Sequence, residues 1–111
     1  MNEFEQICFE MIASSGSAKT FYMSALKEAK DGRFAQAEHT MEAGDEALLE
    51  AQKAHSRLLS KEAGGARYEF SLLLMHAEDQ MMTAETFRLF VSELLDLYAR
   101  LQIRSSWSEM D

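Results

Sequence analysis

The stretch FAQAEHTMEAGDEALLEAQKAHSRL, residues 34–58, decides the fold class. Asp31-Gly32 precedes it and Ala63-Gly64-Gly65-Ala66 follows it, and glycine both weakens a helix and adopts the left-handed conformation that closes one. We therefore predict a helix that begins near Arg33 and ends at the paired glycines. Its small and apolar side chains recur at alternating steps of 3 and 4, the seam of a long amphipathic helix, at Phe34, Ala37, Met41, Gly44, Leu48, Ala51, His55 and Leu58.

Helical periodicity also marks the segments on either side of this stretch. Apolar side chains at helical spacing predict a helix from Glu3 to Lys30 and another from about Tyr68 to about Leu101. The small residues from Ser14 to Ala18 mark either a break or a place where another helix packs closely, and we predict a continuous helix with a weak centre. Residues 104–111 are expected to form a polar, frayed tail whose only large apolar group is Trp107.

Composition favours an all-α protein. The chain of 111 residues has five Gly, no Pro and one Cys, which suits neither a sandwich of many tight turns nor a disulfide framework. At ~1.5 Å per residue, helices of roughly 25 to 30 residues are about 40 Å long, so three of them form a long, thin antiparallel bundle. We predict one such domain over residues 1–103. The segment from Phe70 to Met75 is apolar almost all round, which implies a second buried surface, most simply against another copy of the chain.

The formal net charge of −8 restricts the classes of partner. Phosphate backbones are bound by clustered Lys and Arg, so we expect no nucleic-acid partner, and a protein with a basic docking face is a better match. No run approaches the ~18 to 20 apolar residues of a membrane span, and the segment from Met1 to Glu5 is acidic where a secretory signal is basic. We expect a reduced, cytoplasmic protein that does not insert into a membrane.

His76 stands apart among the three histidines. It ends an apolar run, and Asp79 and Gln80 follow three and four residues later on the same helical face. A carboxylate within reach can orient an imidazole, and neutral imidazole is a nucleophile near pH 7 that can attack phosphorus. One His and one Asp are too few ligands for a closed zinc site. From the residues alone, a structural role and a catalytic role for His76 both stay open.

The other candidate nucleophiles and ligands fit structural roles. His39 has the pattern of an exposed helix residue, and His55 lies on the seam, where we expect it to be paired across the bundle. Cys8 lies on an apolar stripe with no CxxC motif and no neighbouring cation to activate it. The serines at 14, 15 and 17 form no nucleophile elbow, and Gly64-Gly65 lacks the Lys-Ser/Thr of a phosphate loop. No conventional hydrolase or nucleotide site is visible.

The segment Ser71-Leu-Leu-Leu-Met-His76-Ala-Glu-Asp-Gln-Met-Met-Thr83 follows the pattern S-L-L-x-x-H-A-Q-D-H-L-M-T. That pattern is the centre of the IIA components of the lactose/cellobiose (chitobiose) class of the bacterial sugar phosphotransferase system. The resemblance extends over about residues 4–101 through Ala25 to Phe34 with Ala37, Met41 to Gly44, and Leu58 to Gly64. Each short motif is weak, but their order, spacing and extent together are specific.

The resemblance implies a cytoplasmic three-helix protomer that assembles as a trimer of nine helices. By that similarity, His76 accepts a phosphoryl group from the histidine-containing phosphocarrier protein and passes it to a cysteine of the IIB component, for uptake of a β-linked disaccharide such as lactose, cellobiose or chitobiose. Asp79 matches a buried Asp, three copies of which meet around one metal ion, usually taken as Mg²⁺. Three converging carboxylates repel one another unless a cation neutralises them, and a hard divalent ion with oxygen ligands suits that task.

This chain departs from the family pattern at two pairs of positions. Gln80 replaces a His and Glu78 replaces a Gln, so the site loses a possible cation and gains an acid, although Gln80 can still donate an orienting hydrogen bond. The family usually has His and Gln at the positions that Gln52 and His55 hold here. This exchange keeps two polar groups on one helical face and indicates that both are paired in the interior. No Lys or Arg lies within a turn of His76, and we expect a partner or another helix to supply positive charge.

Two other functions compete with the sugar-transport relay. One is a regulatory member of the same family, which keeps the trimer and the histidine but uses phosphorylation to switch a partner. The other is a non-catalytic helical adaptor, because Ala25 to Ala51 has the small residues and Asp-Gly turn of tetratricopeptide-like helix pairs. An adaptor of that kind predicts a second unit about 34 residues on, and the stretch from Leu59 to Leu94 does not repeat the first. The sugar stays open, because a IIA component does not touch it.

Overall fold

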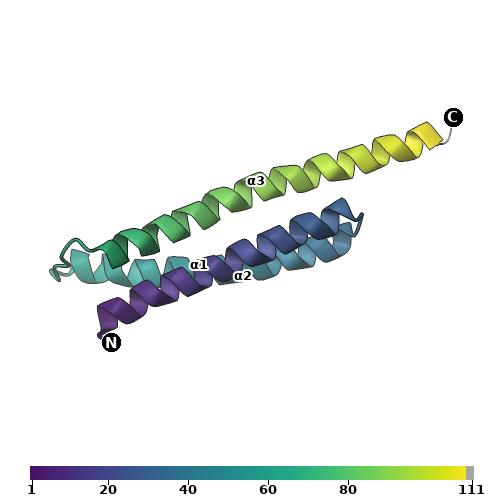
Figure 1. The fold of residues 1–111 in the computed structure, drawn as a ribbon. Coiled ribbons are helices and arrows are strands. Elements are labelled where there is room, and N and C mark those ends of the chain that lie inside the picture. Colours follow the sequence, from purple (N-terminus) through teal and green to yellow (C-terminus); the bar gives the residue numbers. More distant parts are fainter. Residues whose placement is uncertain (110–111) are drawn as a thin grey trace.

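The computed structural model describes residues 1–109, and that range folds into three helices (Figure 1). They are α1 (Glu3–Lys30), α2 (Phe34–Ala63) and α3 (Leu72–Glu109). The first two form an antiparallel hairpin, and α3 runs back alongside it and projects past the α1–α2 turn (Figure 1). The molecule measures 67 × 21 × 19 Å. The predicted all-α, elongated three-helix architecture is confirmed.

The turn between α1 and α2 lies where the Asp-Gly pair predicts it. Gly32 has a φ of 80°, in the left-handed region that favours glycine. The amides of Gly32 and Arg33 donate to the carbonyls of Ala29 and Glu28 at 3.0 and 2.9 Å, which satisfies carbonyl groups left open at the end of α1. The second connection follows Ala63, and Gly65 there has a φ of 105°.

Helix α1 is continuous through its small-residue centre, as predicted. Ser15 and Ala18 are fully buried there. Of the two readings of this segment, close approach of a neighbouring helix is therefore the correct one. At the start of α1, the Asn2 side chain accepts from the Glu5 amide at 2.8 Å and the Glu5 carboxylate accepts from the Asn2 amide at 3.4 Å, a capping box that fixes where the helix begins.

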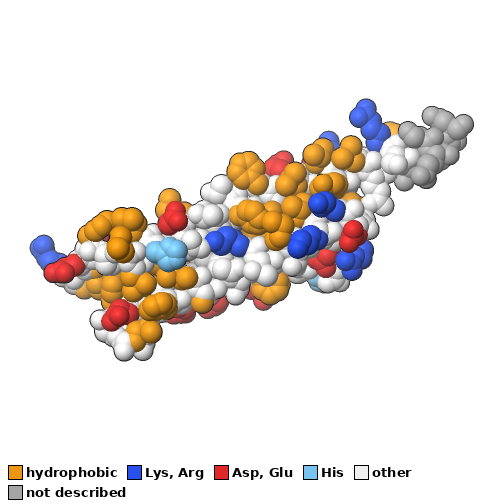
Figure 2. Space-filling model, in the orientation of Figure 1, with side chains coloured by type: hydrophobic (Ala, Val, Ile, Leu, Met, Phe, Trp, Pro, Cys, Tyr) orange, Lys and Arg blue, Asp and Glu red, His pale blue; other side chains and the backbone are white. Residues whose placement is uncertain are grey.

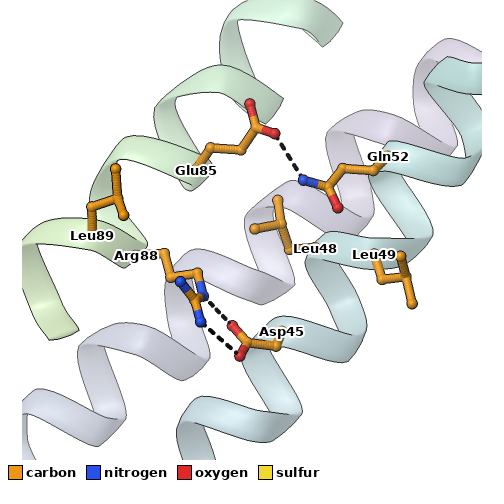
Figure 3. Close-up of a pocket in the computed structure, with 7 residues that line it drawn as sticks. All are labelled: Asp45, Leu48, Leu49, Gln52, Glu85, Arg88 and Leu89. Carbon is orange, nitrogen blue, oxygen red and sulfur yellow. Dashed lines mark hydrogen bonds and ion pairs between the residues drawn. The ribbon is translucent and has the colours of Figure 1, made fainter.

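One buried tyrosine and one carboxylate tie the three helices together. The Tyr22 hydroxyl of α1 donates to Asp45 Oδ1 of α2 at 2.6 Å, and Arg88 Nε of α3 donates to the same oxygen at 2.6 Å (Figure 3 shows the Arg88 side of this cluster). Burial alone raises the pKa of Asp45, but the hydrogen bonds from Arg88 and Tyr22 outweigh it and lower that pKa. Asp45 therefore stays ionised and holds both partners.

The Tyr22 ring lies against the backbone of α2 at Gly44. A Cβ atom at Gly44 would sit 2.5 Å from Tyr22 Cε1 and 2.8 Å from Cδ1, so no larger residue fits without a shift of the ring. Tyr22 is fully buried and pinned by its hydroxyl. Gly44 is therefore the small seam position that lets α1 and α2 approach closely.

The bounds of α3 correct two predictions. The helix begins at Leu72 and not near Tyr68, because Tyr68 stacks on Phe4 with ring centroids 5.0 Å apart and the Ser71 hydroxyl caps the helix by accepting from the Leu74 amide at 3.1 Å. At the other end, the helix does not stop near Leu101 or fray from residue 104. It continues to Glu109, because residues 102–109 contain neither Gly nor Pro to break it. Residues 110–111 of the predicted tail lie outside the described range.

Many large apolar side chains of α3 face solvent in the single chain. Figure 2 shows hydrophobic side chains gathered in patches along the molecule. This exposure agrees with the second buried surface expected for the segment before His76. No helix within residues 1–109 has the length and apolar character needed to cross a membrane. The side chains at the start and along the length of α3 that are about half exposed or more are Leu72, Met75, Met82, Leu89, Phe90, Leu97, Leu101, Ile103 and Trp107.

Candidate functional site

His76 lies in the second turn of α3, and its side chain is exposed. The Ser71 cap and the buried Ala77 hold this end of the helix on the bundle, so His76 projects from a fixed backbone. Among the side chains that the structure describes, the imidazole of His76 has no hydrogen-bond or ion-pair partner. The imidazole is therefore accessible to a reaction partner from solution.

Gln80, one turn after His76, is bonded to a lysine of another helix. Lys19 Nζ of α1 donates to Gln80 Oε1 at 2.6 Å, across 61 positions of sequence. Lys19 is thus a cation from another helix that contacts the residue one turn after His76. The predicted orienting bond from Gln80 to His76 is not among the contacts of the described residues, in which Gln80 accepts from Lys19.

Glu78 reaches toward α2, although its side chain stays partly exposed. Its Oε2 atom lies 2.9 Å from His55 Nε2, with the His55 side chain only 20 % exposed. The predicted pairing of His55 across the bundle is confirmed, and its partner is the acidic residue that the sequence places beside the site. The acid gained at position 78 is thus engaged by an imidazole and does not face His76 freely.

The exchange at positions 52 and 55 is compensated, as the sequence indicates. Gln52 Nε2 donates to Glu85 Oε2 at 2.8 Å, one more contact between α2 and α3 (Figure 3). Together with the His55–Glu78 pair, it gives both polar side chains of this face of α2 a partner on α3.

Asp79 is exposed and lies on the surface of α3 beside Met82, Thr83 and Phe90. No group of three or more His, Cys, Asp or Glu side chains that could hold a metal ion exists within the described part of one chain. Among the described side chains, Asp79 is the one acidic residue that lines this surface of the single protomer.

Comparison with known proteins points to one family. Residues 6–99 match the model of the lactose/cellobiose-specific IIA subunit of the sugar phosphotransferase system. The chain belongs to this family. It is 36% identical over 100 residues, covering 90% of this chain and 86% of the relative, to the N,N'-diacetylchitobiose-specific IIA component of Escherichia coli K12.

Solved structures agree with this assignment. The cellobiose-specific enzyme IIA of Bacillus anthracis superposes with a TM-score of 0.89 at 41% identity, covering 93% of this chain and 94% of that one. A second solved structure is the IIA(chitobiose)–HPr complex of the E. coli phosphotransferase system, in which HPr is the histidine phosphocarrier. Its IIA chain superposes with a TM-score of 0.80 at 34% identity, covering 92% of this chain and 99% of that one. IIA components are phosphotransferase relay proteins with a phosphohistidine intermediate. The present chain is such a phosphotransferase component.

The remaining candidates of this IIA protein have structural surroundings. Cys8 is fully buried, and burial, with Glu78 and Glu5 nearby, raises the pKa of its thiol, so it is a poor nucleophile. His39 is exposed, with its Nδ1 atom 3.9 Å from Glu42 of the same helix. Both agree with the roles expected from the sequence.

Lys19 is the residue near the site that the sequence alone did not single out. It lies in the small-residue centre of α1, far from His76 along the chain. Its spacing on α1 places it beside buried Ala18 at the edge of the helix interface, but which residue of α3 it meets depends on how the two helices are rotated. No local motif carries that information.

Proposed function

We propose that His76 is the residue of this IIA protein that carries the phosphoryl group. The observation that carries the proposal is the contrast among its histidines. His55 is paired with Glu78 and His39 lies beside Glu42, whereas His76 is exposed and unpaired within the described residues. A phosphoryl carrier needs an accessible nitrogen lone pair, and His76 meets that need best.

The transfer is an exchange of one P–N bond for another. The lone pair of a His76 nitrogen forms a bond to phosphorus as the bond to the imidazole of the donor breaks, and the donor nitrogen keeps the electron pair. We propose HPr as donor, by analogy with the E. coli IIA(chitobiose)–HPr complex, and a cysteine of a IIB component as acceptor, in the cytoplasm. The net charge of −8 suits partners with basic docking faces.

The working form in this proposal is a homotrimer packed through α3. Its support is the row of apolar side chains that one chain leaves exposed on that helix, since soluble monomers rarely expose large contiguous apolar patches. Asp79 lies in this row, beside Met82 and Phe90. A threefold arrangement about this face brings three copies of Asp79 together.

The donor set of such a cluster fits one Mg²⁺ ion per trimer. Each copy supplies carboxylate oxygens, the ligand type that hard divalent cations prefer. Thr83 and Thr86 lie on the same face and add hydroxyl oxygens nearby. A bound ion would neutralise the Asp79 charges at the axis.

Replacement of Asp79 by leucine tests the axial arrangement. We expect Asp79→Leu to remain trimeric and to be insensitive to EDTA, because an apolar side chain removes the carboxylate repulsion and fills the same volume. The wild type is expected to lose stability when EDTA is added. Sedimentation velocity and thermal unfolding, each with EDTA and with Mg²⁺, measure both properties.

The control for this experiment is Asp96→Leu. Asp96 is on the same helix but pairs with Arg100 at 3.0 Å, so its loss is expected to leave the response to EDTA as in the wild type. Dissociation of Asp79→Leu into monomers contradicts an axial position for Asp79.

Phosphorylation by the general system tests the function itself. We expect the purified wild type, incubated with phosphoenolpyruvate, the general phosphotransferase enzyme and HPr, to gain one acid-labile, base-stable phosphate per chain by intact mass. Absence of phosphate on a folded trimer contradicts the relay and favours the non-catalytic adaptor. Phosphate that enters but passes to no IIB protein favours the regulatory role.

The engagement of Glu78 by His55 supports the relay over the regulatory alternative. An acid that faces the phosphate would disfavour phosphorylation, and Glu78 is instead bound to His55 of α2. We propose a β-linked disaccharide as the transported sugar. Relatives of similar identity are named for chitobiose and for cellobiose, which agrees with the class and does not choose within it.

A further inference from the structure

The phosphoryl site on α3 has no positive charge of its own. Residues 72–87 contain no Lys or Arg, and Gln80 stands where the family pattern has a histidine. A phosphoryl group on His76 brings negative charge close to Asp79. Without a cation nearby, the phosphorylated form is electrostatically disfavoured.

Lys19 places an ammonium group one helical turn from His76. Its Nζ atom is fixed at 2.6 Å from Gln80 Oε1, and residues four apart on a helix have Cβ atoms about 5–6 Å from each other. Helical side chains lean toward the N-terminus, so the Gln80 side chain leans over the turn that carries His76. The ammonium bound to its end is therefore directed to the same place.

Lys19 has no acidic partner among the described side chains. None of those carboxylates forms an ion pair with it, although other lysines, such as Lys53 and Lys61, have such partners. Lys19 and Gln80 are both half-buried, which holds them in place more firmly than free surface side chains. The amide of Gln80 is a neutral acceptor that positions the ammonium without cancelling its charge.

The bond also fixes which way the Gln80 amide faces. An ammonium only donates, so the amide oxygen turns toward Lys19 and the NH₂ group is left to donate elsewhere. The ammonium and the NH₂ group are then two donors carried at Gln80, one helical turn from His76. A phosphoryl group offers acceptor oxygens, which match this pair.

We propose that Lys19 and Gln80 together bind the oxygens of the phosphoryl group on His76, with Lys19 replacing the positive charge that the family pattern places at position 80. This inference rests on the proposed role of His76. During transfer Lys19 remains protonated, and only the P–N bonds exchange as described above. Lys19 stabilises the product, phosphorylated His76, and Gln80 positions Lys19.

The test is the equilibrium of phosphoryl exchange between phosphorylated HPr and this protein, followed by intact mass. Docking with the donor alters the rate of exchange but not its equilibrium, so this readout reports the phosphorylated site itself. We expect Lys19→Met to shift the equilibrium toward the donor by about tenfold or more, the effect of losing a hydrogen bond to a charged group. The difference from wild type is expected to shrink as salt is raised.

Three further variants separate a phosphate-binding role from a structural one. Lys19→Arg keeps the charge, and its exchange equilibrium is expected to lie close to that of the wild type. In Gln80→Glu the new carboxylate pairs with Lys19 and cancels its charge, so we expect an unchanged or raised unfolding temperature. We also expect the exchange equilibrium to shift toward the donor at least as far as in Lys19→Met. Lys27→Met, an exposed lysine two turns further along α1, is the matched control and is expected to behave as wild type.

The outcomes distinguish this inference from the proposed function. If His76→Ala still takes up phosphate, or the wild type takes up none, the role of His76 fails and this inference fails with it. If His76 is phosphorylated but Lys19→Met and Gln80→Glu, both folded, exchange phosphate within twofold of wild type, only the role of Lys19 and Gln80 is overturned.

Discussion

His76→Ala is expected to take up no phosphate from phosphoenolpyruvate, the general phosphotransferase enzyme and HPr, while the wild type gains one phosphate per chain. The reason is chemical, because the side chain removed carries the only nitrogen lone pair proposed to attack phosphorus. The fold is expected to survive, since His76 is exposed and unpaired within the described residues. Intact mass measures the phosphate, and circular dichroism and sedimentation measure the fold and the assembly.

The matched control is His39→Ala, which removes another exposed histidine, on α2, and is expected to retain full phosphorylation. Residual phosphate on His76→Ala at a stoichiometry near one contradicts the assignment of this residue. Dissociation or unfolding of the variant shows instead that His76 has a structural role that the single chain does not reveal.

Gly44→Ala is expected to destabilise the protein although alanine is the better helix former. The new methyl group falls 2.5 Å from Tyr22 Cε1, and the ring cannot move freely because the Tyr22 hydroxyl is held by Asp45. Overpacking of this kind costs about 1–3 kcal/mol, against about 1 kcal/mol gained in helix propensity. We expect the free energy of unfolding to fall by up to about 2 kcal/mol in a urea titration.

Gly16→Ala is the control with the opposite expected sign. It also lies inside a helix, but an added Cβ meets no atom within 4 Å, so the variant should gain about 0.5–1 kcal/mol of stability from helix propensity alone. Both titrations are made at one protein concentration, because assembly contributes to apparent stability. Equal effects of the two substitutions contradict the close packing of Tyr22 on Gly44.

The helices could be predicted where the signal is local. The Asp31-Gly32 turn and the paired glycines after Ala63 lie at the predicted places, since glycine closes a helix through its own backbone freedom. The start of α3 was missed for a reason that is only partly local. Ser71 is a recognisable cap, but Tyr68 leaves the helix to stack on Phe4, a residue from the other end of the chain.

The site was predicted in part. The order of His76, Asp79 and Gln80 on one helical face follows from helical geometry, and these residues lie within the range 6–99 that matches the IIA family model. The partner of His55 could be anticipated as a polar group across the bundle but not identified as Glu78. Lys19 could not be found, because its contact with Gln80 depends on the rotation and register of α1 against α3.

By itself the sequence determined the number of helices, their turns, the candidate histidine on the third helix and the family, because each follows from local periodicity or from short motifs in a fixed order. Only the tertiary structure decided which side chains of separate helices meet. It turned Glu78 toward His55 and brought Lys19 to Gln80. These pairings set the charge around His76, and they depend on how whole helices pack, which no short segment encodes.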